Sequence, residues 1–210
     1  MHKTKEKILN VSLRLFNESG FPNVRLQHLA DGAGISVGNL AYHYPNKESI
    51  LQALHAQLTQ EQRALMAEFR IVPLFEYWER QMQRSFDLFC AYAFFYQDTL
   101  ELIRAYPAIQ EAHQKQVQWQ IKQNRMSLAF NVSRGALEKE AAAGQYESLA
   151  VHVWMTSESW LLRQQILGKK PDQYFPFREA LWQLIRPFFT EIGRKEFEQL
   201  NRLLQEEGVV

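Results

Sequence analysis

The chain has 210 residues, of which 46% are hydrophobic and 22% charged, a balance typical of a folded domain with a buried core. Its formal net charge is +1, so bulk charge by itself favours neither a nucleic-acid partner nor a membrane surface. Cys90 is the one cysteine, which excludes an intrachain disulfide and any metal site with two cysteine ligands.

Nearly the whole sequence has the pattern of α-helices. Apolar residues recur three and four positions apart over long stretches that lack glycine and proline, and the alternation typical of strands is absent. We therefore expect an all-α protein. The predicted helices, in chain order, cover residues 4–19, 25–32, 36–44, 46 onward, 86–103 with a break near 92, 107–139, 147–167, 177–190 and 194–205.

The turn between the second and third predicted helices indicates a helix-turn-helix. Gly34 is a residue that adopts a positive φ at little cost between two close helices. Ser36 is expected to cap the third helix, which stops before Pro45, and Asn46 is expected to cap the fourth. Two helices joined by a tight glycine-containing turn form the motif that places its second helix in a DNA major groove.

The third predicted helix has an outer face that is too polar for core and too aromatic for an ordinary solvated surface. Ile35 and Leu40 are expected to point to the core, and Gly38 adds no bulk where another molecule approaches. A major groove accepts hydrogen-bonding side chains and apolar groups that meet thymine methyls. The side chains left facing outward are Val37, Asn39, Tyr42 and His43.

The region beyond Pro73 holds all five tryptophans and the apolar run from Phe86 to Ile103. The aromatic residues of this region either form plain core or line a ligand cavity, since helical spacing alone does not separate the two. With no basic cluster or glycine-rich loop to hold phosphate, the composition favours a hydrophobic or aromatic small molecule over a sugar phosphate. The candidate ligand-binding residues are Phe89, Tyr92, Tyr96, His113 and Trp119.

Two helix faces near the C-terminus carry more apolar side chains than a terminal surface helix needs. They are expected either to close the core of one chain or to pair two chains in a homodimer. The candidate dimer-interface residues are Val151, Trp154, Glu158, Leu161, Leu181, Ile185 and Phe188.

Other classes of function find little support in the sequence. The six histidines show no spacing typical of a metal site, and a cysteine in an apolar helix is usually a small buried hydrophobe. We therefore expect no metal, no cofactor and no enzymatic activity. No run of about 18 apolar residues could span a membrane and no signal peptide is expected, which with the single cysteine predicts a cytoplasmic protein without a membrane partner.

Two segments near the N-terminus, ILNVSLRLFNESGF at 8–21 and LQHLADGAGISVGNLAYHYPNKESIL at 26–51, resemble the TetR family of bacterial transcriptional regulators. The resemblance implies a three-helix DNA-binding head, followed by a larger helical body for ligand binding and dimerisation. It also implies a homodimer that represses transcription until a small molecule binds. The implied domains are a head over residues 1–50, a connecting helix over 51–72, and an effector-binding and dimerisation domain over 73–210.

Carried onto this sequence, the base-reading helix of the family falls on residues 36–44. The sequence departs from the family at Ala41, where tyrosine is usual, and at Val37, where a basic or polar residue is common, so base preference does not carry over. Gln27 and Lys47 would approach phosphates. The resemblance implies that the contacts to double-stranded DNA, at a palindromic operator, come from Gln27, Ser36, Val37, Gly38, Asn39, Tyr42, His43 and Lys47.

Two alternatives stay open. A protein of the same fold could regulate without a small-molecule effector, through protein partners or occupancy alone, and a solidly packed body would favour this interpretation. The other alternative is a helical enzyme or binding module whose head no longer binds DNA. The near-neutral charge and Val37 leave room for it.

Overall fold

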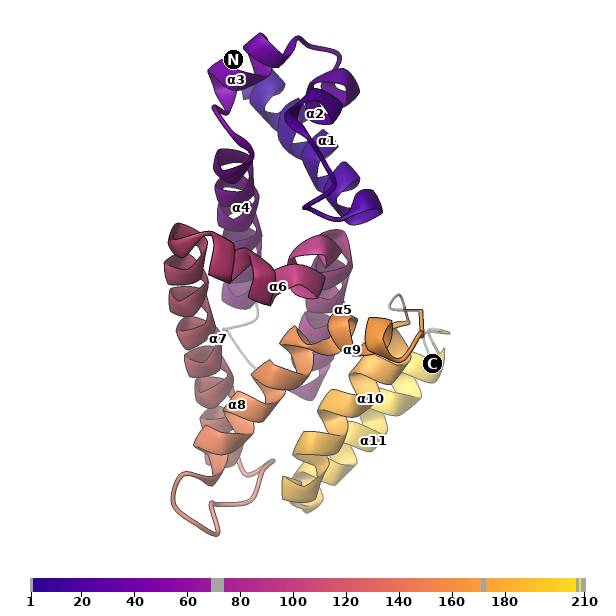
Figure 1. The fold of residues 1–210 in the computed structure, drawn as a ribbon. Helices are drawn as coiled ribbons and strands as arrows, with labels where there is room; N and C mark the ends of the chain where they lie inside the picture. Colours follow the sequence, from indigo (N-terminus) through magenta and orange to yellow (C-terminus); the bar gives the residue numbers. More distant parts are fainter. Residues whose placement is uncertain (1, 69–73, 171–172, 207, 209–210) are drawn as a thin grey trace. The chain divides into compact units, whose positions relative to one another are not determined.

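The computed structural model describes residues 2–68, 74–170, 173–206 and 208, and within them the fold is all-α, as the sequence predicts (Figure 1). These residues form eleven α-helices and one 3₁₀ turn, without a strand. None of the helices is long and apolar enough to cross a membrane. The elements are α1 (His2–Ser19), α2 (Leu26–Ala33), α3 (Val37–His43), α4 (Lys47–Glu68), α5 (Phe75–Ala91), α6 (Ala93–Ala105), α7 (Pro107–Ser133), α8 (Gln145–Glu158), α9 (Trp160–Ile166), α10 (Tyr174–Ile185), η1 (Arg186–Phe188) and α11 (Glu191–Glu206).

The helices divide into two compact units. The first comprises residues 1–61 and 91–114, and the second comprises residues 62–90 and 115–210. This division differs from the expected ranges because 91–114, which contains α6, packs with the N-terminal helices. The expected domain boundary near 71–73 lies outside the described residues.

Aromatic rings and one asparagine attach α6 to α1 within the first unit. The ring of Phe94 lies 5.3 Å from that of Phe16 and 6.4 Å from that of Phe21, between centroids. Such pairs add about 0.5–1.5 kcal/mol each beyond the burial of their area. The side chain of Asn17 donates a hydrogen bond to the Ala91 carbonyl and accepts one from the Phe94 N–H. These interactions join residues more than 70 positions apart, which a local helix pattern does not report.

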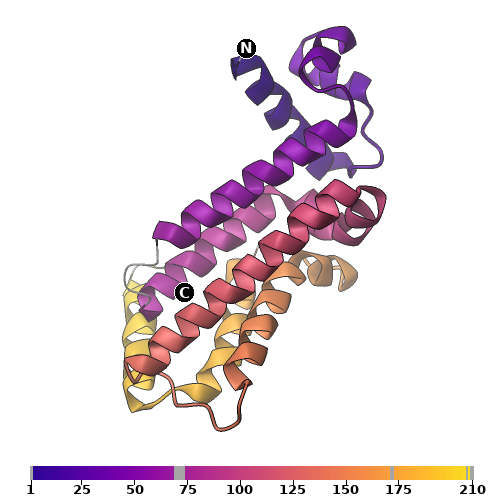
Figure 2. The same ribbon diagram turned by 90° about the vertical axis from the view of Figure 1, so that its left-hand side faces the viewer.

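Trp182 on α10 lies in the core of the second unit. Its side chain is fully buried, and its ring lies 4.8 Å from Phe197 on α11 and 5.2 Å from Phe75 on α5. Figures 1 and 2 show α10 and α11 lying side by side. Gly193 permits the close approach of α11 to the chain after α7, because a Cβ there would lie 2.2 Å from the Ala136 carbonyl oxygen.

Two helices differ from their sequence prediction for local reasons. The helix expected over 107–139 ends at Ser133, because Gly135 adopts a φ of +77° and turns the chain. The helix expected over 147–167 is interrupted at Ser159, which separates α8 from α9. The predicted break near residue 92 is confirmed, since α5 and α6 meet there.

Candidate functional site

The turn between α2 and α3 has the local geometry that the sequence predicts. Gly34 adopts a φ of +64° and its N–H donates to the Asp31 carbonyl, which ends α2. The Ser36 hydroxyl accepts a hydrogen bond from the Asn39 N–H at 3.1 Å and caps α3. These short-range bonds fix the direction in which α3 leaves the turn.

Two glycines near this turn have different structural requirements. A Cβ on Gly32 would lie 2.7 Å from Cγ1 of Val11, so the packing of α2 on α1 needs a glycine there. A Cβ on Gly38 would meet nothing closer than the Ser36 hydroxyl at 4.0 Å, and Gly38 has no positive φ. The fold therefore does not require a glycine at position 38 of α3.

The outer face of α3 presents side chains that the fold does not bury. Leu40 is fully buried and anchors the helix, whereas Tyr42 is 75% exposed. Ser36 and Asn39 are also exposed. The ring of half-buried His43 lies 5.2 Å from that of Tyr42, edge to face. An exposed tyrosine beside polar side chains on one short helix is a surface suited to hydrogen bonding and to contact with base edges.

The two residues expected at phosphates lie beside α3, and both side chains already have partners. Gln27 on α2 is exposed, and its amide donates to the Asp31 carboxylate at 2.7 Å. The Lys47 ammonium donates to the carbonyl oxygens of Phe21 at 2.7 Å and Val24 at 3.0 Å. It also lies 4.2 Å from the centre of the Phe21 ring. Burial lowers the pKa of Lys47. This geometry gives Lys47 a structural role in holding the loop before α2.

Other lysines lie closer to the free surface of the head. The ammonium of Lys5 lies 5.9 Å from the centre of the Tyr44 ring, at the C-terminal end of α3. The ammonium of Lys7 lies 3.6 Å from the position of a Cβ on Gly34, at the turn. Both lysines are exposed on α1. They border the two ends of α3 and carry the positive charge that phosphate contacts need.

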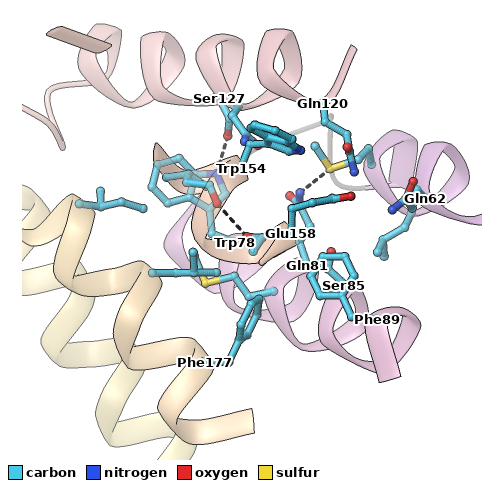
Figure 3. A pocket seen from close by; sticks show the side chains of 18 of the residues that line it. Gln62, Trp78, Gln81, Ser85, Phe89, Gln120, Ser127, Trp154, Glu158 and Phe177 are labelled. Atoms are coloured by element: carbon cyan, nitrogen blue, oxygen red, sulfur yellow. Dashed lines mark hydrogen bonds between the residues drawn. The ribbon is translucent and has the colours of Figure 1, made fainter. Parts of the chain in front are cut away.

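The second unit contains a cavity of about 110 Å³ between its helices (Figure 3). Most of the side chains around it are apolar or aromatic, and these include Trp78, Phe89, Trp154 and Phe177. The indole N–H of Trp78 donates to the Ser127 hydroxyl on α7. The cavity is therefore a concave, mainly apolar space with a few polar groups, which is the form that small-molecule sites usually take.

The candidate ligand-binding residues divide between the two units. Phe89 lines the cavity. The Tyr92 hydroxyl instead donates to the Glu61 carboxylate in the first unit. Tyr96 and His113 also belong to the first unit, and Trp119 lies in the second unit but does not line this cavity. These four residues lie away from this cavity, and their ligand-binding role stays a prediction.

The break between α5 and α6 explains why most of these residues lie away from the cavity. It sends the second half of the aromatic run into a different unit from Phe89. Tyr96 is buried there, and the ring of His113 packs 5.2 Å from that of Phe95. The guanidinium carbon of Arg63 lies over the Trp119 ring, 5.3 Å from the centre of that ring.

Several candidate dimer-interface residues belong to the inside of one chain. Leu161, Leu181 and Ile185 are 1%, 2% and 3% exposed, so they contribute almost no surface to a partner. Trp154 and Glu158 are half-buried and line the cavity, as Leu181 and Ile185 also do. The prediction is corrected for Leu161, Leu181 and Ile185, because an apolar helix stripe packs equally well against its own chain. Val151 and Phe188 are half-buried.

The sequence did not single out the cavity residues on α7, which include Gln120, Asn124, Ser127 and Leu128. They recur at three- and four-residue spacing on one face of a long helix, and that spacing was the available signal. Among the described residues, no group of three His, Cys, Asp or Glu side chains is placed to hold a metal ion.

Comparison with known proteins links both units to one family. A family model for bacterial regulatory proteins of the tetR family matches residues 8–54. A second TetR model, described as a bacterial transcriptional repressor, matches residues 52–197. The HTH-type transcriptional regulator UidR of Escherichia coli (strain K12) is 33% identical over 67 residues, or 32% of this chain and 33% of the relative. The chain therefore matches about a third of the length of this curated relative.

Solved structures share the fold over nearly the whole chain. A TetR-family transcriptional regulator from Marinobacter aquaeolei VT8 has a TM-score of 0.85 at 20% identity, covering 94% of this chain and 97% of its own. A protein from Saccharomonospora viridis, solved in complex with choline, has a TM-score of 0.72 at 18% identity, covering 89% and 97%. Because the second family model spans more than half of its residues, the chain belongs to the TetR family of DNA-binding bacterial transcriptional regulators.

Proposed function

We propose that this regulator is a homodimeric repressor that reads a palindromic operator with α3 and leaves it when a small hydrophobic or aromatic molecule enters the cavity of the second unit. The observation that carries the DNA part is the outer face of α3. It keeps Tyr42 75% exposed and has a glycine at position 38 that the fold does not require. Both features suit close contact with a groove.

In this proposal Asn39 and Tyr42 contact base edges, with Ser36, Val37 and His43 beside them. Lys5 and Lys7 supply phosphate contacts at the two ends of α3, as does Gln27 after releasing Asp31. Lys47 holds the loop between α1 and α2 from within the head.

A palindromic operator requires two heads, and exposed apolar side chains on α8 and α9 support a dimer surface. Met155, Leu162 and Ile166 are 51%, 39% and 74% exposed. Leu162 and Ile166 are four residues apart on α9, which places them along one helical stripe, and Met155 lies on the preceding helix α8. Exposed apolar stripes are typical of protein–protein interfaces. This stripe takes the place of the buried leucines and isoleucine that the sequence suggested.

The cavity supports an effector. A solidly packed body would have favoured a regulator without one, whereas this body contains an apolar space of about 110 Å³. A solved protein of the same fold was crystallised in complex with choline, so a protein of this fold can bind a small molecule. The effector would act by binding the operator-incompetent conformation more tightly than the operator-bound one.

The test of the DNA assignment is selection of bound fragments from a randomised DNA pool at a stated salt concentration. We expect a palindrome whose half-sites lie one helical turn or more apart. On that sequence, Asn39→Ala should change the preference at one base position by about 1–3 kcal/mol and leave binding to random DNA unchanged. Equal losses on selected and random DNA would contradict base reading by Asn39. No enrichment by the folded protein would count against the proposal as a whole.

The dimer stripe has a matched control on α11. Ile166→Glu should convert the protein to a monomer in sedimentation analysis, because it buries a charge in the proposed interface. Ile192→Glu changes an isoleucine that is 57% exposed on a different helix and should leave the dimer intact. A dimer that survives Ile166→Glu would place the interface elsewhere.

A further inference from the structure

The side chains around the cavity have an unusual balance of charge. The polar lining residues are otherwise neutral glutamines, asparagine and serines, and Glu158 is the one ionisable side chain among the described residues of the lining. Neither lysine, arginine nor histidine occurs in that lining. Within this lining, an anionic ligand would therefore meet a carboxylate and no basic side chain.

Glu158 reaches the cavity from the last turn of α8. Figure 3 shows its side chain pointing towards Gln62, between Gln120 and Phe89. It is half-buried, so its charge is only partly screened by water. A carboxylate in such a place stabilises a positive charge that is brought beside it.

Two other residues of the lining each have a buried polar atom without a hydrogen-bond partner among the described residues. These atoms are the indole N–H of Trp154, one turn before Glu158, and the side-chain carbonyl oxygen of Gln120 on α7. Buried polar atoms of this kind usually find a partner in water or in a ligand. The Gln120 oxygen is an acceptor and would take an N–H from the ligand.

The apolar walls fit the rest of such a ligand. Trp78 and Trp154 present indole rings, and Phe89 and Phe177 add phenyl rings. Aromatic faces attract organic cations and also bury a hydrocarbon body. Carboxylate, acceptor amide and aromatic walls together describe a site for a hydrophobic ammonium ion.

We propose that the effector is a small hydrophobic amine in its protonated form, whose ammonium group lies between Glu158 and Gln120 while its aromatic or aliphatic body lies against the tryptophan and phenylalanine rings. This rests on the proposed effector role of the cavity, and names the chemical class of the molecule.

A charge series on one hydrocarbon body tests the proposal. The probes are 3-phenylpropylamine, 3-phenylpropanol and 3-phenylpropionate, which are cationic, neutral and anionic at pH 7. We expect calorimetry to give the amine an affinity about tenfold or more above that of the alcohol, with the propionate weakest. Glu158→Gln preserves the shape of the side chain and should remove most of this preference. Glu198→Gln, an exposed site on α11, is the control and should keep it.

The outcomes separate the ligand class from the effector role. Equal binding of the three probes, no binding of the amine, or a preference that survives Glu158→Gln would overturn the proposed class. Operator affinity is then measured with and without the amine. An amine that binds through Glu158 but leaves operator affinity unchanged would support the class and reject the effector role. Release of the operator by neutral molecules alone would support the effector role of the cavity and reject the proposed ligand class.

Discussion

The guanidinium of Arg178 and the carboxylate of Glu79 form a buried ion pair across 99 positions of the sequence. The Arg178 Nε donates to both carboxylate oxygens at 2.8 Å, and the two residues are 1% and 4% exposed. The same carboxylate accepts from the Tyr174 hydroxyl at 2.6 Å and from the Trp182 indole N–H at 2.8 Å. Burial, together with this carboxylate, raises the pKa of Tyr174. One acidic side chain on α5 thus fixes three residues of α10.

Loss of Glu79 should be among the most damaging single changes in the second unit. Glu79→Leu leaves the Arg178 charge buried without its main partner, which costs about 3–5 kcal/mol in unfolding free energy. The double variant Glu79→Leu/Arg178→Met removes both charges and should be less destabilised than Glu79→Leu alone. Urea unfolding of the wild type, Glu79→Leu, Arg178→Met and the double variant measures this. A double variant whose destabilisation equals the sum of the two single changes would contradict a coupled pair.

The stability of the fold should decrease as the pH decreases, because of the buried His55 on α4. It is 5% exposed, and burial together with the nearby His113 lowers its pKa from the usual 6.5 to about 4. The unfolded chain then binds a proton more readily than the folded one below pH 6.5. The contribution of neutral His55 to the free energy of unfolding is therefore complete above pH 6.5, and it is lost as the pH falls from 6.5 towards 4. At pH 5 the loss is about 2 kcal/mol.

His55→Gln should remove this component of the pH dependence, because glutamine does not titrate. Unfolding free energies at pH 7 and pH 5 make the comparison. His152→Gln, at an exposed position of α8, should keep the wild-type dependence. Parallel losses in wild type and His55→Gln would show that other groups carry the effect.

Lys47 should matter for stability more than for phosphate binding. Lys47→Met removes hydrogen bonds from a charged donor to the Phe21 and Val24 carbonyls and should cost about 1.5–3 kcal/mol. The dependence of operator affinity on salt should hardly change. Lys5→Met should do the opposite, with little effect on unfolding. It should reduce the slope of log K against log salt by about 0.9 for each phosphate that is no longer neutralised. If Lys47→Met kept a normal melting temperature but reduced the salt dependence of operator affinity, Lys47 would be a phosphate contact and not a structural residue.

Gly38→Ala should separate folding from DNA binding. The site has room for a methyl group, so alanine should stabilise α3 by about 0.5–1 kcal/mol through helix propensity. The same methyl group should weaken operator binding if the backbone of α3 approaches the groove closely. Gly32→Ala is the counterpart, since its methyl group meets Val11 and should destabilise the head. Unchanged operator affinity in Gly38→Ala would remove this glycine from the interface.

Local interactions allowed the sequence by itself to determine the all-α class, the helix-turn-helix and the face of α3. The cap formed by Ser36, the turn at Gly34 and the burial of Leu40 each depend on residues within one or two turns of helix. Their patterns therefore lie in short stretches of sequence, and the structure agrees with them. The bulk charge carried no such information about DNA.

Only the tertiary structure decided which apolar faces meet. A stripe such as Leu161 or Leu181 predicts burial but does not say whether the covering surface belongs to the same chain. Lys47 lies more than 20 residues from the carbonyls that hold its ammonium, and Glu79 lies 99 residues from Arg178. The cavity collects residues from α4, α5, α7, α8 and α10. Helical periodicity reports the side of a helix that avoids water, whereas partners so distant are fixed only when the helices pack together.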